Sequence, residues 1–325
     1  MLASDLLDAL RSPFPADALD QPTGGAVVVE LGAGSSGVDA VARDAFAPLP
    51  CVVVGIGDAA SDLAELCDVL LAADHPQLET VLATVATNPL AATALAMLLR
   101  GSTDRTVGDG LVAESAAYST LQGGPEFAAW RATTPVRTRV DDEGSPVRVE
   151  RSGTRLEVTL TRPQVHNAFD ARMRDALLDA LSIAVDDAEI TEVVLSGDGP
   201  SFCSGGDLDE FGSRPDPATA HMVRLARSPA RVLARLAPRT TARLHGACMG
   251  SGIELPVFAG RVVAHPDTEI GLPEIGMGLV PGAGGTVSLP RRIGRQRTAL
   301  LALARTNLDA ATALEWGLVD EICER

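Results

Sequence analysis

The sequence predicts an α/β fold built around a core of small apolar side chains. Short β-branched runs bounded by Gly or Asp alternate with stretches that carry apolar residues at helical spacing, an order typical of α/β layers. Hydrophobic residues make up 46% of the 325-residue chain, but aromatic residues make up only 3%. Ala, Leu and Val must therefore fill the core of one large domain or two smaller ones.

The first α/β segment is predicted over residues 1–75. Three β-branched runs in it have the length and flanking residues of buried strands, and a helical stretch precedes the last of them. The runs are AVVVELG, CVVVGIG and CDVLLAA, at 26–32, 51–57 and 67–73, and the helical stretch is 58–67. We therefore expect a small α/β layer at this end of the chain.

A helical segment is predicted to follow, over residues 76–132. Apolar residues recur at helical spacing throughout it, Gly101 marks one stop, and the run Gly-Gly-Pro at 123–125 breaks the last helical pattern. The three helical patterns are 76–86, 89–101 and 111–132. Residues 133–148 are polar and are predicted to be an extended linker.

The second α/β segment is predicted over residues 149–325. Strand-like and helix-like stretches alternate along it, with Pro, Gly and Asp at the boundaries. The expected strands are 155–163, 192–199, 240–248 and 261–267, and the expected helices are 170–187, 218–237 and 296–304.

Two parts of the chain share one order of features. Residues 51–76 and 241–266 each contain a strand, a small-residue turn, a helix, an Asp or Gly, a second strand and His-Pro. A chance match between two apolar α/β patterns is the alternative. We favour a degenerate internal duplication.

The charge distribution excludes two classes of partner. Residues 1–150 carry 8 Arg and 21 acidic residues, whereas residues 151–325 carry 19 Arg and 22 acidic residues, so most of the net charge of −16 lies in the first half. Such a surface repels nucleic acid and anionic membranes. Local Arg clusters in the second half can meet an anionic ligand.

The lysine and cysteine content and the N-terminal stretch limit the possible reaction mechanisms and the possible cellular location. The chain has no Lys, which excludes a Schiff-base lysine mechanism, and its five Cys lack metal-like spacing. Sparse, unpaired cysteines favour reduced thiols and a cytoplasmic location. The N-terminal stretch has acidic residues and no basic region, and no apolar run is long enough to cross a membrane, so neither a signal peptide nor a membrane span is expected.

Two small-residue turns in the second segment can carry chemistry. In SFCSGGDLDEF (201–211) and HGACMGSGIE (245–254), a strand meets a helix through small residues, which leaves backbone N–H groups free to bind negative charge. Two such turns facing one point would form an oxyanion hole. The alternatives are a plain Gly turn with Asp207 as a helix cap, and small residues that give clearance for helix packing.

Two glutamates accompany these turns. Glu254 is a lone charge in the apolar stretch MGSGIELPVFAG (249–260), and burial of a carboxylate is costly unless it is paired, protonated or hydrogen-bonded. Glu274 lies in the turn-rich stretch GLPEIGMGLVPGAGGT (271–286), where a solvated carboxylate is the commoner case.

Taken together, the order of these motifs resembles the crotonase superfamily of enoyl-CoA hydratases and isomerases. The resemblance spans about 149–322 and implies a spiral of ββα units, with 149–325 as the catalytic core. The matching stretches are RPQVHNAFD (162–170), FCSGGDLDEF (202–211), HGACMGSGIELPVFAGRVVA (245–264), IGLPEIGMGLVPGAGGTVSLPRRIG (270–294) and ALEWGLVDEI (313–322).

The resemblance implies roles for individual residues. Backbone N–H groups of Gly206 and Ser251 would form the oxyanion hole for a thioester oxygen, with Ser251 at a position that is usually Gly in the family. Glu254 and Glu274 would grip one water, and Glu274 would deliver a proton to C2. The acyl-CoA would also be bound by Arg162, His166, Asn167, Ala168, Gly205, Asp207, Leu208, Gly250, Pro273 and Gly282. The backbone of 166–168 would meet the adenine. Coenzyme A is part of the substrate, and no metal or separate cofactor is expected.

Four further arginines recur at three- or four-residue spacing and can line one face of a helical segment. They are Arg224, Arg227, Arg231 and Arg235. They can help to bind the phosphates of coenzyme A; a solvated surface stripe is the alternative.

The predicted function is addition of water to a 2-enoyl-CoA thioester. Attack of water at C3 places negative charge on the thioester oxygen, where two fixed N–H donors stabilise it, and two close carboxylates move the protons. The alternatives are another acyl-CoA reaction of the superfamily, namely isomerisation, hydrolysis or cofactor-free dioxygenation, and a non-catalytic partner subunit of another crotonase-like protein.

The chain departs from the family at its two ends. Members of the family continue past the segment that GLVDEI matches into helices that close the site and build a trimer, and here residues 76–132 resemble those helices. We therefore interpret 1–75 as a degenerate crotonase-like copy followed by its helical tail, which closes its own active site or that of a neighbour. A homo-oligomer, trimer or hexamer, or a complex with another crotonase-like subunit is expected.

Overall fold

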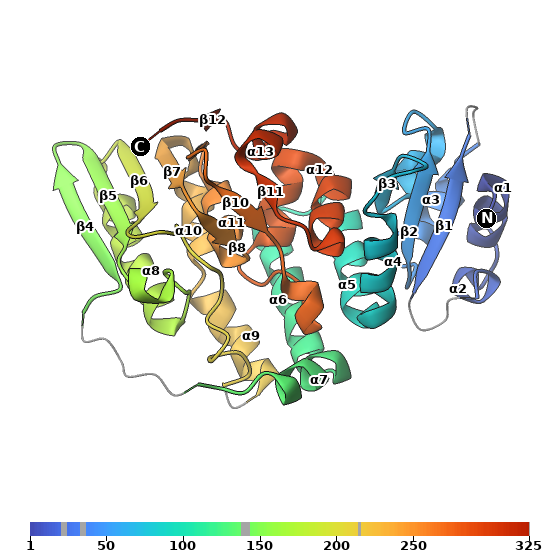
Figure 1. Ribbon diagram of the computed structural model, residues 1–325, viewed down its shortest axis with the longest axis horizontal. Coiled ribbons are helices and arrows are strands. Elements are labelled where there is room, and N and C mark those ends of the chain that lie inside the picture. The colour runs from blue at the N-terminus through green and yellow to red at the C-terminus, as the bar shows by residue number, and fades with distance from the viewer. Residues whose placement is uncertain (21–24, 33–36, 138–143, 214–215, 325) are drawn as a thin grey trace.

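The computed structural model describes residues 1–20, 25–32, 37–137, 144–213 and 216–324. Helices and strands alternate over both α/β segments, so the predicted α/β class is confirmed. Figure 1 shows a small N-terminal sheet at one end of the molecule, the largest sheet at the other end, and helices between them.

The largest sheet forms the frame of the second segment. Among the described residues its strands lie in the order β12-β9-β7-β6-β5-β4, and all neighbours are parallel except the β4–β5 hairpin. Burial alternates along β7 and the first part of β5, because one face of the sheet packs on the core. The strands are β4 (Val147–Ser152), β5 (Arg155–Leu160), β6 (Glu192–Gly197), β7 (Thr240–Leu244), β9 (Arg261–Ala264) and β12 (Glu321–Ile322).

A smaller sheet carries the second small-residue turn. It joins β8 (Ala247–Met249), β10 (Glu269–Gly271) and β11 (Leu308–Asp309), with β8 and β10 parallel. The single strand predicted over 240–248 is therefore wrong, since it divides into β7 and β8. The chain turns at Gly246, whose φ is +51° and where a Cβ would lie 2.0 Å from the carbonyl oxygen of Pro200.

Most helices of the second segment begin at side-chain caps. Carboxylates of Asp170, Asp216 and Asp309 accept N–H bonds at the starts of α8, α9 and α13. The single helix predicted over 218–237 is wrong, because Ser228 starts a new helix before Pro229, which cannot continue the first one. The helices are α8 (Ala171–Asp186), α9 (Pro217–Ala226), α10 (Pro229–Leu236), α11 (Ser251–Glu254), α12 (Gly285–Ala304) and α13 (Ala310–Trp316).

The N-terminal segment forms a parallel sheet in the order β1-β2-β3, with its own core of apolar side chains. The three predicted strands are confirmed. The helix predicted over 58–67 is wrong, because a turn at Asp58–Ser61 uses the first residues and only a 3₁₀ turn, Asp62–Leu66, remains. The elements are α1 (Ala3–Leu10), α2 (Pro15–Ala18), β1 (Ala26–Leu31), α3 (Ala40–Phe46), β2 (Val52–Gly57) and β3 (Val69–Leu71).

Each part of the proposed duplication contains a parallel strand pair, but the connections differ: a 3₁₀ turn lies between β2 and β3, whereas β8, α11 and a further 3₁₀ turn lie between β7 and β9. β2 pairs with β3, and β7 pairs with β9, in each case in parallel. Their common descent, and the description of 1–75 as a degenerate crotonase copy, stay predictions.

The helical segment packs between the two α/β segments. Its helices are α4 (Leu78–Thr87), α5 (Pro89–Arg100), α6 (Val107–Gln122) and α7 (Pro125–Thr133), separated as predicted at Gly101 and at 123–125. α4, α5 and α6 contact α12, and α6 also contacts α9. Figure 1 shows α6 beside α9 and α12. The segment therefore covers the core of its own chain. Residues 138–143 of the predicted linker lie outside the described residues, and β4 begins within its last two positions.

Arg100, at the end of α5, links the N-terminal layer to the rest of the molecule. Its Nε and Nη2 donate to the carboxylate of Asp68 at 2.9 and 2.7 Å. Its Nη groups also donate to the carbonyl oxygens of Phe46, Leu49 and Cys51. The side chains of Arg100 and Asp68 are only 2% and 1% exposed. A buried guanidinium and carboxylate thus satisfy each other where α5 meets the N-terminal sheet segment.

No single described helix is both long and apolar enough to cross a membrane. α4 and α5 meet the length and composition criteria only as a pair, and they are bent by 111°.

Candidate active site

The two small-residue turns lie side by side. The N–H of Met249 donates to the carbonyl oxygen of Cys203. The backbones of Cys203 and Cys248 pair as an isolated parallel β-bridge, and both thiols are free. Gly252 packs directly on the first turn, since a Cβ there would lie 2.1 Å from the same carbonyl oxygen. The sequence pattern of small residues is thus explained by close backbone approach.

These turns leave two backbone N–H groups available. Among the described residues, the N–H groups of Gly206 and Ser251 make no hydrogen bond, and both residues line one pocket. Ser251 begins α11, so its N–H has no intrahelical acceptor. The flanking N–H groups of Asp207 and Gly250 are bonded to Phe169 and Gly271. The arrangement can bind a developing negative charge on one oxygen atom.

The carboxylates of Glu254 and Glu274 face a common space above Gly250. A Cβ at Gly250 would lie 2.3 Å from Oε1 of Glu274 and 3.8 Å from Oε1 of Glu254. Both side chains are buried, at 2% and 7% exposure. Oε2 of Glu254 accepts N–H bonds from Ala283 and Gly285 at 2.7 and 2.8 Å, whereas Oε2 of Glu274 has no partner among the described residues.

A third buried carboxylate, Glu114, enters the same pocket from α6. Its oxygens accept from the N–H groups of Gly284 and Thr286, at 2.7 and 2.8 Å, and from the hydroxyl of Thr286 at 2.7 Å. Glu114 and Glu254 therefore share the free N–H groups at the start of α12, where the helix dipole favours negative charge. The sequence analysis missed Glu114, although a lone charge in the apolar stretch LVAESAAYS is the same kind of signal that singled out Glu254.

Burial raises the pKa values of all three carboxyl groups, and the charge of Glu254 adds to the effect on Glu114 and Glu274. Burial raises the pKa of Glu254 to about 7, and burial together with the charge of Glu254 raises the pKa of Glu114 to about 8. The pKa of Glu274 is also raised well above its ordinary value, chiefly by burial. Because Glu274 receives the fewest hydrogen bonds from N–H or O–H donors, it is the group best suited to hold a proton while Glu254 is ionised.

The three carboxyl groups predict that the free energy of unfolding depends on pH. Glu114→Gln is expected to weaken this pH dependence. The folded state binds protons that the unfolded carboxyl groups, with an ordinary pKa of 4.5, release. The free energy of unfolding is therefore expected to fall as pH rises from 4.5 to about 8. Urea denaturation at several pH values should show a shallower fall for Glu114→Gln. Glu126→Gln, which alters a partly exposed carboxylate that caps α5, should keep the wild-type slope; equal slopes in all three proteins would contradict the prediction.

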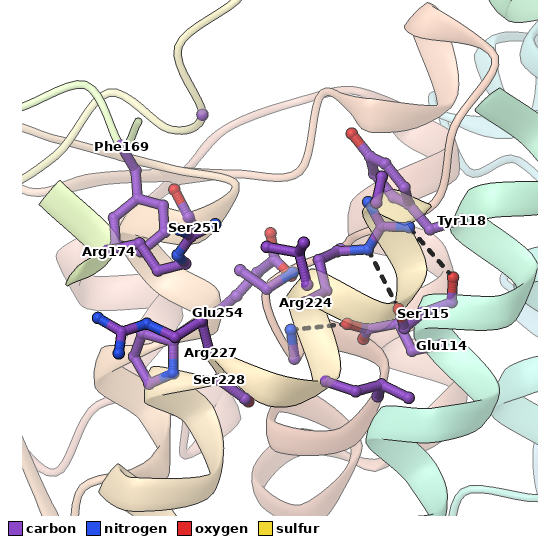
Figure 2. Close-up of a pocket in the computed structure, with 18 of the residues that line it drawn as sticks. Glu114, Ser115, Tyr118, Phe169, Arg174, Arg224, Arg227, Ser228, Ser251 and Glu254 are labelled. Atoms are coloured by element: carbon purple, nitrogen blue, oxygen red, sulfur yellow. Dashed lines mark hydrogen bonds between the residues drawn. The ribbon is translucent and has the colours of Figure 1, made fainter. Parts of the chain in front are cut away.

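The three carboxylates and the two free N–H groups open onto one pocket of about 520 Å³. This size suits a small-molecule ligand. In Figure 2, Glu254 lies between Phe169, Arg174 and Ser251 on one side and Tyr118 and Arg224 on the other. α6 supplies a large part of the wall, including Leu111, Glu114, Ser115, Tyr118 and Gln122. The helical segment therefore completes the pocket of its own chain.

The arginine stripe divides between pocket and surface. Arg224, Arg227 and Arg231 line the pocket, whereas Arg235 is exposed outside it. Arg174, which the stripe did not include, also lines it. Arg174 and Arg227 both contact Asp175, at 2.8 and 3.0 Å. Arg227 and Arg231 are also exposed, so the stripe is partly a surface feature, and its role in binding phosphates stays a prediction.

Some predicted ligand-binding residues line the pocket and others support it. Asp207 and Gly282 line it, as do Gly206, Ser251, Glu254 and Glu274. The remaining predicted binding residues flank lining residues or lie in the loop that holds the first turn: Arg162, His166, Asn167, Ala168, Gly205, Leu208, Gly250 and Pro273.

Asn167 illustrates the supporting role. Its side chain is fully buried, and its amide donates to the carbonyl oxygens of Asp198, Ser201 and Phe202. These bonds hold the loop and occupy the side-chain amide, which agrees with a predicted role for the backbone of 166–168; binding of the adenine there stays a prediction. His166 bonds to Ser201 and Arg162 pairs with Asp170, so both also brace this loop.

No group of three or more His, Cys, Asp or Glu residues in the described ranges is arranged to hold a metal ion.

Residues 150–325 match the family model described as enoyl-CoA hydratase/isomerase. The 2,3-dehydroadipyl-CoA hydratase of Escherichia coli strain K12 is 33% identical over 174 residues, which cover 54% of this chain and 68% of that protein. The enoyl-CoA isomerase/hydratase fer4 of Mycosarcoma maydis is 31% identical over 176 residues, covering 51% of this chain. The peroxisomal bifunctional enzyme of Danio rerio is 32% identical over 170 residues, covering 52% of this chain. The chain spans 64% of fer4 and 22% of the Danio rerio enzyme, less than two thirds of either.

Solved structures agree with this match. The enoyl-CoA hydratase from Thermoplasma volcanium GSS1 superposes with a TM-score of 0.52 at 34% identity, covering 56% of this chain and 73% of that one. An enoyl-CoA hydratase from Bacillus anthracis gives a TM-score of 0.51 at 28% identity, covering 55% and 70%. The likeness extends over about half of the present chain, and the predicted crotonase-like fold is confirmed there.

Proposed function

Because the chain belongs to the enoyl-CoA hydratase/isomerase family, we propose that it adds water across the double bond of a 2-enoyl-CoA thioester. The observation that carries the proposal is the pair of carboxylates, Glu254 and Glu274, which face one small space beside two free backbone N–H groups. A reaction that builds charge on a thioester oxygen and moves two protons needs these groups together.

In the proposed mechanism the thioester oxygen accepts hydrogen bonds from the N–H groups of Gly206 and Ser251. A water held between the two carboxylates attacks C3 and gives a proton to the ionised Glu254. Negative charge passes to the thioester oxygen, and the protonated Glu274 delivers a proton to C2. The N–H bonds from Ala283 and Gly285 keep Glu254 ionised and oriented, because they favour the charged form.

The arginines at the pocket give the proposal its second support. Arg174, Arg227 and Arg231 line the pocket, and Figure 2 shows Arg174 and Arg227 on the same side of Glu254 as Ser251. Their charge can meet the phosphates of coenzyme A. Assembly into a trimer or hexamer, or with another crotonase-like subunit, stays a prediction.

The proposal is tested by incubating the protein with crotonyl-CoA and longer 2-enoyl-CoA thioesters and following the loss of enoyl absorbance. Hydration of at least one of them is expected. Migration of the double bond in a 3-enoyl-CoA without any hydration would support isomerisation instead. Oxygen uptake with an aryl-acetyl-CoA, or failure to bind any acyl-CoA, would overturn the proposal in favour of dioxygenation or a non-catalytic role.

Gly250→Ala is expected to abolish most of this activity. Its φ is +50°, and the added Cβ would lie 2.3 Å from Oε1 of Glu274, so the carboxylate must leave its position. Gly153→Ala is the matched control, because Gly153 has a φ of +59° but nothing within 4 Å of an added Cβ. Both variants should lose some thermal stability, and only Gly250→Ala should lose kcat. Similar kcat values in the two variants would argue against the assigned position of Glu274.

A further inference from the structure

We infer that Arg224 forms a subsite for a negatively charged group on the acyl chain, so that the preferred substrate is a 2-enoyl-CoA whose chain ends in a carboxylate. This inference rests on the proposed function, because it concerns the same pocket. It starts from the surroundings of Arg224, which lies on α9 and lines the pocket.

Among the described residues, the Arg224 guanidinium contacts only neutral groups. Its Nε donates to the hydroxyl of Ser115 at 3.1 Å, and its Nη2 donates to the carbonyl oxygen of Ser115 at 3.4 Å and to the hydroxyl of Ser119. The guanidinium carbon lies 4.6 Å from the ring centre of Tyr118. Within the described part of the chain, no carboxylate lies within 4.0 Å of it.

Arg100 and Arg174, which are also enclosed, have acidic partners: Arg100 pairs with Asp68, and Arg174 pairs with Asp175. A cation removed from water is costly without a counter-charge, and burial accordingly lowers the pKa of Arg224 below its ordinary value. A negatively charged ligand group would supply the missing partner.

Glu114, the residue before Ser115, does not fill that role. Its two oxygens are occupied by Gly284 and Thr286 at the start of α12, although its charge still acts on Arg224 from a distance. Glu114 is therefore bound to the start of α12 and Arg224 to the hydroxyl groups of α6, and the two charges do not pair.

The guanidinium is fixed in place before any ligand binds. The hydroxyl of Ser115 lies 2.9 Å from Nδ1 of His221, and the hydroxyl of Ser119 donates to the carbonyl oxygen of Pro217 at 2.8 Å. These bonds tie Arg224 to both α6 and α9. Its Nη1 makes no hydrogen bond to any described residue, which leaves one donor edge for a ligand.

The position of Arg224 in the pocket indicates which part of the substrate it would contact, namely the acyl chain. In Figure 2, Ser251, Arg174 and Arg227 lie on one side of Glu254, whereas Arg224, Tyr118 and Ser115 lie on the other. A thioester bound at Ser251, with its coenzyme A leaving past Arg174 and Arg227, directs the acyl chain past Glu254 toward Arg224. The group that reaches Arg224 is then the far end of that chain.

The test compares pairs of CoA thioesters of equal length, from five to eight carbons, that end in a methyl group or a carboxylate. The wild-type protein should show a kcat/KM at least about tenfold higher for one carboxylate-ended 2-enoyl-CoA than for its methyl-ended partner. Arg224→Gln should remove that preference, because kcat/KM falls much more for the carboxylate-ended thioester than for its methyl-ended partner. Arg224→Lys should retain part of it. Arg235→Gln, an exposed arginine outside the pocket, is the control and should behave as wild type.

Binding of the saturated acyl-CoA pairs, measured by calorimetry, separates this inference from the proposed reaction. Tighter, Arg224-dependent binding of the carboxylate-ended thioester without hydration of any enoyl-CoA would support the inference and overturn the proposed hydratase activity. Equal binding and equal turnover of the two members of every pair by wild-type protein would overturn the inference. So would an equal loss for both members in Arg224→Gln, because that result indicates a purely structural role.

Discussion

Glu254→Gln and Glu274→Gln are each expected to lower kcat for hydration by about a hundredfold to ten-thousandfold, while acyl-CoA thioesters still bind. Each substitution keeps the size of the side chain and removes one proton-transfer group. In Glu254→Gln the amide oxygen can still accept the N–H bonds of Ala283 and Gly285, so the pocket should keep its shape.

The measurement is turnover of the best enoyl-CoA from the panel, with thermal shift of a saturated acyl-CoA as the binding readout. Glu269→Gln is the matched control, because Glu269 is exposed on β10 and lies outside the pocket. For the wild-type protein, kcat/KM should fall at low pH, where Glu254 gains a proton, and at high pH, where Glu274 loses one. If either variant kept more than about a tenth of wild-type turnover, the assigned roles of the pair would be wrong.

Arg100→Leu is expected to cost about 3–5 kcal/mol of unfolding free energy, because it leaves the buried carboxylate of Asp68 without its partner. The carbonyl oxygens of Phe46, Leu49 and Cys51 lose their donor in the same step. Arg295 lies 3.7 Å from Asp68 but cannot replace the two short bonds from Arg100.

Urea denaturation followed by far-UV circular dichroism measures this change. Arg43→Leu is the control, because Arg43 forms an exposed ion pair with Glu65 and its loss should change stability much less. The double variant Arg100→Leu/Asp68→Leu should be more stable than Arg100→Leu alone, since it leaves no unpaired buried charge. Equal stability of Arg100→Leu and Arg43→Leu would show that the N-terminal layer is not held to the rest of the molecule by this pair.

The largest errors in the sequence-based description concern turns and helix breaks. The helical pattern at 58–67 is apolar enough for a helix, but the chain between β2 and β3 is too short once the turn at Asp58 has formed. The strand pattern at 240–248 continues through Gly246, and only the close approach to Pro200 shows why the chain must turn there. The periodicity of apolar residues predicts which face of a helix or strand is buried. It does not predict where neighbouring segments force the chain to bend.

The sequence by itself determined the α/β class, most of the strands and helices and the two small-residue turns, and it singled out Glu254 as a lone charge in an apolar stretch. Each depends on local pattern: β-branched runs, helical spacing, small residues at a strand–helix junction, and a lone charge in an apolar stretch. Only the tertiary structure decided what occupies the far wall of the pocket. Glu114, Tyr118 and Ser115 come from a helix more than a hundred residues before the start of α12, and they reach the site because α6 packs on α9 and α12 of the same chain. The same packing encloses Arg224 without an acidic partner. A linear pattern cannot predict such a pairing, because the energy of a buried charge depends on which distant groups the fold brings to it.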